Sequence, residues 1–118
     1  MKKLFNLFRN PTHPLSKEEY WKKWELIELI EDLHLAEALL SKYEGGYSGD
    51  FLSAQEFHRA LIEEIDKLES ENRTDLNQIW IWFSPTCAWD DFVGRDGIEL
   101  GNRIFQRADN WKKGTKNL

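Results

Sequence analysis

The chain has 118 residues and a mass of 14.0 kDa, with 41% hydrophobic, 31% charged and 14% aromatic residues, which is the size and composition of one globular domain. Its single cysteine, Cys87, excludes an intrachain disulfide and a zinc site built from several thiolates. The sequence contains no run of about 18 apolar residues and no signal-peptide core of about 7–15 apolar residues, so we expect a cytoplasmic protein.

The net charge of −5 is unevenly distributed along the chain. Residues 1–16 carry three basic side chains and no acidic one, whereas residues 17–72 carry fifteen acidic and six basic side chains. Residues 73–118 carry six acidic and seven basic side chains. An acidic field of this kind repels phosphate backbones and attracts cationic surfaces. We therefore expect no direct binding of nucleic acid, and a basic protein as the partner.

Residues 1–15 are predicted to form an N-terminal arm. Positions 2–9 consist mainly of basic and apolar residues, in the order Lys-Lys-Leu-Phe-Asn-Leu-Phe-Arg. Such a segment can touch a membrane, but it is too short to bind one firmly by itself. We expect the arm to pack onto the helical body instead, and we predict no membrane partner.

Two helix starts share the pattern Leu-Ser-x-x-Glu-aromatic, once at Ser16 and once at Ser53. The serine hydroxyl can accept a hydrogen bond from the N3 amide, the glutamate can bind the cap amide, and the leucine can pack on the aromatic ring. The pattern predicts helices over residues 16–44 and 53–70, with Gly45 ending the first.

The helix over residues 16–44 is apolar on two sides. The residues of one side are Tyr20, Trp24 and Ile27, and those of the other are Leu26, Ile30, Leu33 and Leu40. A helix of this kind lies between other elements or is kinked, and we favour a central helix. The helix over residues 53–70 has one apolar face, formed by Phe57, Leu61, Ile65 and Leu68.

Residues 76–83 fit either a helix or a strand. Thr74 or Asp75 can cap a helix, but the run Ile-Trp-Ile-Trp-Phe at 79–83 also suits a strand. A lone strand has nothing to pair with, so we favour a helix. Pro85 ends it and displaces Ser84 from the α region.

A structured loop over residues 84–94 is predicted before the last helix. Asp96 can cap that helix, which we expect to end near Trp111 and to be followed by a frayed tail over residues 112–118. Gly101 inside it costs about 1 kcal/mol relative to alanine, which indicates a close approach of another element. The expected fold is all-α, a compact bundle of about four helices in one domain.

An acidic stripe runs along the middle of the first helix. Its members lie within about 120° of the helix surface, and they are Glu25, Glu28, Glu31 and Asp32. Like charges at i+3 and i+4 each destabilise an isolated helix by roughly a few tenths of a kcal/mol. We predict that the stripe is not neutralised within the chain and binds a cationic partner, with a solvated face as the plainer alternative.

The residues around the aspartate pair form a second candidate site. They are Trp89, Asp90, Asp91, Asp96 and Glu99. Paired carboxylates can hold a metal ion or share a proton, although neither aspartate begins the ligand spacing of an EF-hand loop. We expect a structured loop in which Trp89 and Phe92 enter the core and one aspartate binds loop amides. A metal or ligand site is the alternative.

Two further groups of residues are not favoured as sites. Cys87 could act as a nucleophile with a histidine base, but we expect a small buried side chain. Glu31 and His34 form a Glu-x-x-His pair of the kind used in di-iron bundles, with Glu37 three residues on. Because the pair occurs once, we expect no metal, no cofactor and no catalytic residues.

The stretch Pro-Thr-Cys-Ala-Trp-Asp-Asp-Phe-Val-Gly at 85–94, followed by Ile-Glu-Leu-Gly-Asn-Arg-Ile-Phe at 98–105, has the look of a family signature. In size, acidity, its six tryptophans and its lack of a catalytic motif, the chain resembles small bacterial immunity proteins. These are cytoplasmic binders that block a toxin from a competing or sibling cell. The resemblance implies an inhibitor and assigns no individual residue.

We therefore predict an immunity-type inhibitor that occludes a basic toxin, with a nuclease as one candidate. The acidic stripe would pair with the toxin's cations and exposed aromatics would anchor the contact. One alternative is a small metal- or ligand-binding protein or enzyme centred on Asp90 and Asp91. Another is a structural or oligomeric module, because six tryptophans can exceed what one small core hides.

Overall fold

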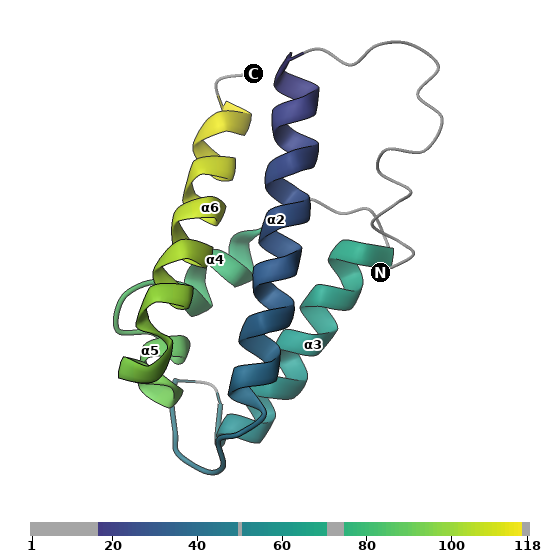
Figure 1. The fold of residues 1–118 in the computed structure, drawn as a ribbon. Helices are drawn as coiled ribbons and strands as arrows, with labels where there is room; N and C mark the ends of the chain where they lie inside the picture. The colour runs from purple at the N-terminus through teal and green to yellow at the C-terminus, as the bar shows by residue number, and fades with distance from the viewer. Residues whose placement is uncertain (1–16, 50, 71–74, 117–118) are drawn as a thin grey trace.

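The computed structural model describes residues 17–49, 51–70 and 75–116. Its helices in chain order are α2 (Lys17–Leu40), α3 (Ala54–Ser70), α4 (Asn77–Phe83), α5 (Ala88–Phe92), the 3₁₀ helix η1 (Gly94–Gly97) and α6 (Ile98–Lys116) (Figure 1). The described residues contain no strand, so the predicted all-α bundle is confirmed. None of the described helices has the length and apolar content that crossing a membrane requires. The predicted arm over residues 1–15, the cap Ser16 and residues 117–118 lie outside the described residues.

The long helix α2 lies between α3 and α6 and runs antiparallel to both (Figure 1). Its core residues are Leu26, Leu29, Ile30, Leu33, Ala36 and Leu40. The prediction of a central helix is confirmed. On the predicted second apolar side, Ile27 is partly buried against the core, whereas Trp24 is 58% exposed. Arg103 and Arg107 of α6 lie against other positions of α2, where they meet carboxylates.

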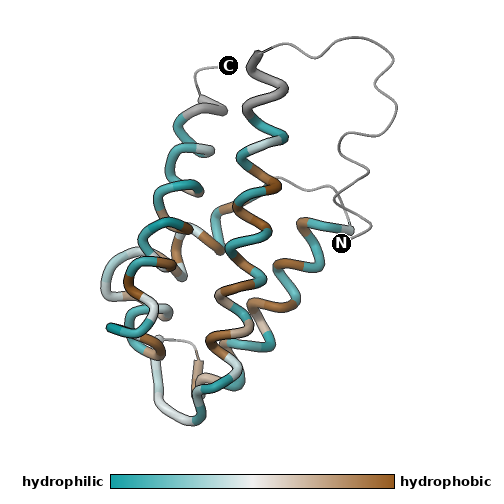
Figure 2. Tube along the Cα trace, viewed as in Figure 1, coloured by the Kyte–Doolittle hydropathy of each residue, from teal (hydrophilic) through white to brown (hydrophobic). Residues whose placement is uncertain are grey.

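Helix α3 follows the prediction closely. Ser53 Oγ accepts a hydrogen bond from the Glu56 amide at 3.1 Å, which confirms the N-cap. All four residues of the predicted apolar face are buried, and Figure 2 shows apolar positions recurring along the helix. Leu52 is 70% exposed, so the predicted packing of this leucine on Phe57 is not made.

Residues Asn77–Phe83 form the helix α4, and the strand alternative for this segment is wrong. The N-cap of α4 is Leu76 and not Asp75 as predicted, although Asp75 Oδ1 accepts a hydrogen bond from the Asn77 amide at 3.0 Å. Thr74 lies outside the described residues. Ser84 adopts φ −63° and ψ 152°, the extended conformation predicted for a residue before proline.

The segment over residues 84–94 is more ordered than the predicted loop, because it contains α5 and leads into η1. Two aspartates in the first turn of α5 suit the positive end of a helix dipole. Trp89 is 1% exposed, and its Nε1 donates a hydrogen bond of 2.9 Å to the Gly97 carbonyl. A Cβ on Gly101 would lie 2.4 Å from the Trp89 ring, so the predicted close approach is confirmed.

Aromatic rings fill the end of the bundle where α3, α4 and α5 meet. The ring centroid of Phe57 lies 5.6 Å from that of Trp82 and 5.7 Å from that of Phe92. Phe83 stacks on Trp89 at 4.9 Å. Such ring pairs contribute about 0.5–1.5 kcal/mol each beyond their buried area. The prediction that Trp89 and Phe92 enter the core is therefore confirmed.

Helix α2 ends at Leu40, before the predicted end at Glu44. The amides of Lys42 and Tyr43 bind carbonyls three residues back, and this tight turn closes the helix. The turn leaves the Tyr43 hydroxyl free to donate a hydrogen bond of 2.8 Å to Asp96 Oδ2. Asp96 lies in η1, so it is not the N-cap of α6 as predicted.

Helix α6 continues to Lys116, beyond the predicted end near Trp111. The Lys113 ammonium forms an ion pair of 2.7 Å with Asp109 one turn back, and Trp80 Nε1 donates to the same carboxylate at 3.1 Å. These contacts tie the last turns to α4. The predicted frayed tail is therefore wrong for its residues 112–116.

Candidate functional site

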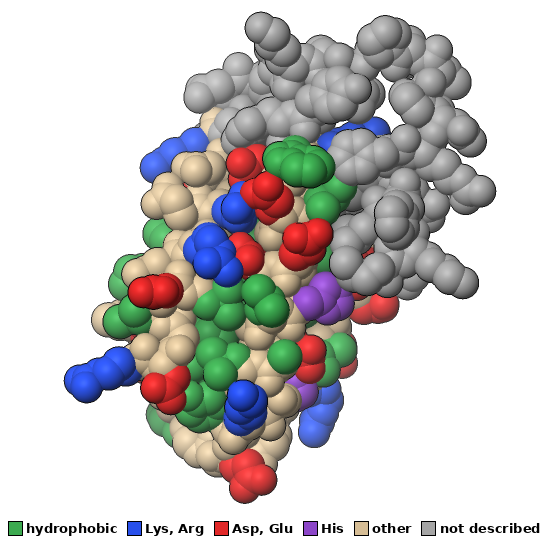
Figure 3. Space-filling view, in the orientation of Figure 1, with side chains coloured by type: hydrophobic (Ala, Val, Ile, Leu, Met, Phe, Trp, Pro, Cys, Tyr) green, Lys and Arg blue, Asp and Glu red, His purple; other side chains and the backbone are tan. Residues whose placement is uncertain are grey.

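Arg103 and Arg107 of α6 reach the acidic stripe of α2, where basic and acidic side chains intermingle on the surface (Figure 3). Arg107 Nη1 lies 2.6 Å from Glu28 Oε2 and 3.1 Å from Glu25 Oε2. Arg107 Nε faces Asp32 Oδ2 at 3.3 Å without a hydrogen bond. Arg103 donates two hydrogen bonds of 2.9 Å to the two oxygens of Asp32, the bidentate geometry that gives strong pairs.

The prediction of an unneutralised stripe is therefore wrong for three of its four carboxylates, Glu25, Glu28 and Asp32. The physical reason is that the antiparallel packing of α6 on α2 brings two arginines, spaced by one helical turn, opposite these carboxylates. The hydrogen bonds with Asp32, followed by its charge, raise the pKa of the Arg103 guanidinium. The ion pairs of Arg103 and Arg107 with these carboxylates thus connect α2 and α6.

Glu31 is the remaining carboxylate of the stripe, and it is exposed without an ion pair to any residue that the structure describes. It lies between Trp24 and Leu35 on the solvent side of α2, since spacings of seven and four residues share one helical strip. Trp24 is 58% exposed and Leu35 is 56% exposed. This strip combines large apolar side chains with a solvent-facing charge.

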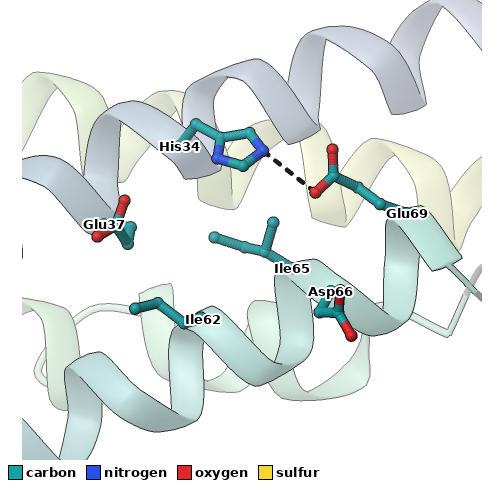
Figure 4. A pocket seen from close by; sticks show the side chains of 6 residues that line it. All are labelled: His34, Glu37, Ile62, Ile65, Asp66 and Glu69. Atoms are coloured by element: carbon teal, nitrogen blue, oxygen red, sulfur yellow. Dashed lines mark ion pairs between the residues drawn. The ribbon is translucent and has the colours of Figure 1, made fainter. Parts of the chain in front are cut away.

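A surface cavity of about 230 Å³ lies beside this strip, between α2 and α3 (Figure 4). Its lining residues are His34, Glu37, Ile62, Ile65, Asp66 and Glu69. Ile65 is almost fully buried, whereas Ile62 is 43% exposed. The cavity therefore has an apolar part contributed by α3 and three carboxylates around it.

Histidine–carboxylate pairs join α2 and α3 at this cavity. His58 Nε2 lies 2.8 Å from Glu37 Oε1, and His34 Nε2 lies 3.3 Å from Glu69 Oε1 (Figure 4). The His34 nitrogen is buried and makes no hydrogen bond within the described structure. A buried polar atom without a hydrogen bond is uncommon in folded proteins.

In the second candidate site, around Asp90 and Asp91, the two aspartates form hydrogen bonds with different partners. Asp90 Oδ2 accepts a hydrogen bond from the Thr86 amide at 2.8 Å, as expected for an aspartate that binds a loop amide. Asp91 Oδ2 accepts one from the buried Ser48 hydroxyl. In the part of the chain that the structure describes, no three His, Cys, Asp or Glu side chains are grouped to hold a metal ion.

The other sequence candidates are engaged elsewhere or lie on the surface. Glu99 is exposed in the first turn of α6. Cys87 is only half-buried, before the first turn of α5, rather than fully buried as predicted. His34 pairs with Glu69 of α3, so the predicted Glu-x-x-His pair with Glu31 is not the contact formed.

Sequence reasoning did not single out Ile62, Asp66 and Glu69 of α3. Their spacings of four and three residues place them on one strip of α3, next to its buried face. That spacing is the signal that could have found them. It becomes informative only once α2 is known to lie beside α3, because His34 and Glu37 complete the cavity.

Comparison of the chain with protein-family models, with curated proteins and with solved structures found no match.

Proposed function

We propose that the chain is a binding protein for a basic partner protein, which it recognises through the surface formed by α2 and α3. The observation that carries the proposal is the cavity in which Glu37, Asp66 and Glu69 stand beside two isoleucines. A lysine or arginine side chain can lay its aliphatic stem on the isoleucines and bring its cation to the carboxylates.

The distribution of charge supports this choice of surface. The arginines of α6 neutralise the carboxylates on the side of α2 that faces α6. On the other side, the carboxylates Glu37 and Glu69 pair with histidines and not with arginines or lysines. An acidic field that remains on the α3 side would steer a cationic partner toward the cavity.

The exposed apolar residues support a protein rather than a small cation as the partner. Trp24 and Leu35 on α2 and Ile62 on α3 are each more than two-fifths exposed. Large aromatic and aliphatic side chains anchor protein interfaces when a partner covers them. A basic protein surface with apolar side chains among its cations would match both features.

The finer proposal is an immunity-type inhibitor that acts in a bacterial cytoplasm. A toxin that binds nucleic acid uses lysine and arginine side chains to hold phosphates. A carboxylate-bearing surface that pairs with those cations would block the toxin by occlusion, without a cofactor and without catalysis by the inhibitor. Self-association through the same apolar residues is the alternative, because a second copy would also cover them.

The test is capture of partners by the immobilised full chain from the lysate of the source organism, at low salt and at about 0.5 M salt. We expect a basic protein that is retained at low salt and weakened at high salt. The purified partner would then be assayed for toxic or nuclease activity against increasing amounts of the chain, with complete inhibition near one equivalent.

Two results would contradict the proposal. One is retention of the partner at equal strength by a chain carrying Asp66→Lys and Glu69→Lys, whose cavity has two charges reversed. The other is a stable dimer of the chain in light scattering, with Trp24 and Leu35 covered by the second copy.

A further inference from the structure

The cavity between α2 and α3 is open to one further occupant, a segment of the same chain. Glu37, Asp66 and Glu69 line it together with Ile62, whose side chain is exposed (Figure 4). Leu35 is exposed on the neighbouring strip of α2. An occupant that matches this surface needs basic and apolar side chains close together and no acidic ones.

Residues 2–9 have that composition. They include Lys2, Lys3 and Arg9, and four of the eight are leucine or phenylalanine. No acidic residue occurs before position 18. The chemistry of the segment is therefore complementary to the cavity in charge and in apolar content.

The length of chain before α2 is sufficient for this contact. His34 lies 17 residues after the start of α2, which is about 26 Å along a helix that rises about 1.5 Å per residue. Arg9 precedes Lys17 by eight residues, and an extended chain of eight residues also spans about 26 Å. Lys3 precedes Lys17 by fourteen residues, a span of about 46 Å, so the whole segment can lie along the cavity.

We propose that residues 2–9 dock on the surface formed by α2 and α3, with basic side chains at Glu37, Asp66 and Glu69. A tether of this length gives the segment an effective concentration on the order of millimolar, so a contact that is weak between separate molecules is populated within one chain. An external basic partner at this surface then has to displace the segment. The docking itself does not depend on the proposed function.

Disulfide trapping in the full-length chain tests this docking. Asn6→Cys supplies a thiol in the segment, and Ala38→Cys supplies one at an exposed position of α2 one turn after His34. Cys87→Ser removes the native thiol. The matched control replaces Ala38→Cys by Asn102→Cys, at an exposed position of α6 beside Arg103. Circular dichroism confirms that each variant folds, and disulfide formation is followed in dilute protein with oxidised glutathione.

We expect trapping at Ala38→Cys at least tenfold faster than at Asn102→Cys. Reversing the segment's charges with Lys2→Glu, Lys3→Glu and Arg9→Glu is expected to bring the two rates within twofold of each other. Equal rates in the parent pair would overturn the inference, and so would fast trapping at Ala38→Cys that survives the charge reversal.

The outcomes separate this inference from the proposed function. Trapping without capture of any basic protein would leave the segment as the occupant and remove support for an external partner. Capture without trapping would leave the external partner and refute the docking.

Discussion

Replacing Gly101 by alanine tests the packing of α5 on α6, because the direction in which the free energy of unfolding changes depends on that packing. A Cβ at this position would lie 2.4 Å from both Cδ1 and Nε1 of Trp89, whereas nonbonded carbon atoms prefer about 3.5–4.0 Å. Trp89 cannot move aside easily, because its Nε1 is bonded to the Gly97 carbonyl and its ring stacks on Phe83.

The expected loss of stability follows from two opposing effects. Overpacking of a core costs about 1–3 kcal/mol, and alanine recovers about 1 kcal/mol of helix propensity relative to glycine. Because a Cβ at 2.4 Å overlaps the Trp89 ring strongly, the cost of overpacking lies in the upper part of this range. Gly101→Ala is therefore expected to lower the free energy of unfolding by about 1–2 kcal/mol. For a chain of this length that is a decrease in Tm of roughly 4–8 °C.

The assay is thermal and urea unfolding followed by circular dichroism, with Asn102→Ala as the control on the exposed side of the same helix. The control is expected to change stability by less than about 0.5 kcal/mol. If Gly101 were only a poor helix former, Gly101→Ala would raise Tm by roughly 4 °C. A rise in Tm would therefore refute the close packing of Trp89 against α6.

Three further substitutions test individual contacts that stabilise the bundle. Arg107→Ala leaves Asp32, Glu25 and Glu28 near one another without this arginine. We expect it to lower the free energy of unfolding by about 2 kcal/mol, between the values for exposed and buried ion pairs. Arg95→Ala, at an exposed position of η1, is the control and is expected to change it little; chemical denaturation measures both. Ser53→Ala removes the cap of α3 and is expected to cost about 1 kcal/mol in the same assay. The hydrogen bond from Lys113, followed by that from Trp80, lowers the pKa of the Asp109 carboxyl group. The ionised Asp109 therefore stabilises the fold fully above its ordinary pKa of 3.8, and this stabilisation is lost as the pH falls through the lowered pKa. The unfolding free energy of Asp109→Asn is therefore expected to fall less steeply than that of the parent below about pH 4, and equal slopes would contradict this assignment.

Local patterns in the sequence were sufficient where a residue's partners lie a few positions away. The Ser53 cap and the buried face of α3 are of this kind, and both are found in the structure. The extended Ser84 before Pro85 depends only on sterics between neighbours. Gly101 indicated a close contact, although nothing local identified Trp89 as the residue that makes it.

The candidate site was harder to predict because its residues belong to different helices. Asp32 and Arg103 are 71 residues apart, so the spacing of carboxylates along α2 gave no sign of their neutralisation. The cavity depends in the same way on His34 and Glu37 meeting Asp66 and Glu69. Such sites follow from which helix faces are neighbours, and that depends on the packing of the whole bundle.

The affinity of the captured partner for two charge-reversed variants tests the central claim most directly. Asp66→Lys and Glu63→Lys change the net charge equally and lie three residues apart on exposed positions of α3, but only Asp66 lines the cavity. In isothermal titration calorimetry we expect Asp66→Lys to weaken binding at least tenfold, about 1.4 kcal/mol, and Glu63→Lys to weaken it less than about threefold, since a charge outside the contact acts mainly through the association rate. Equal effects of the two variants would contradict a binding site at the cavity between α2 and α3.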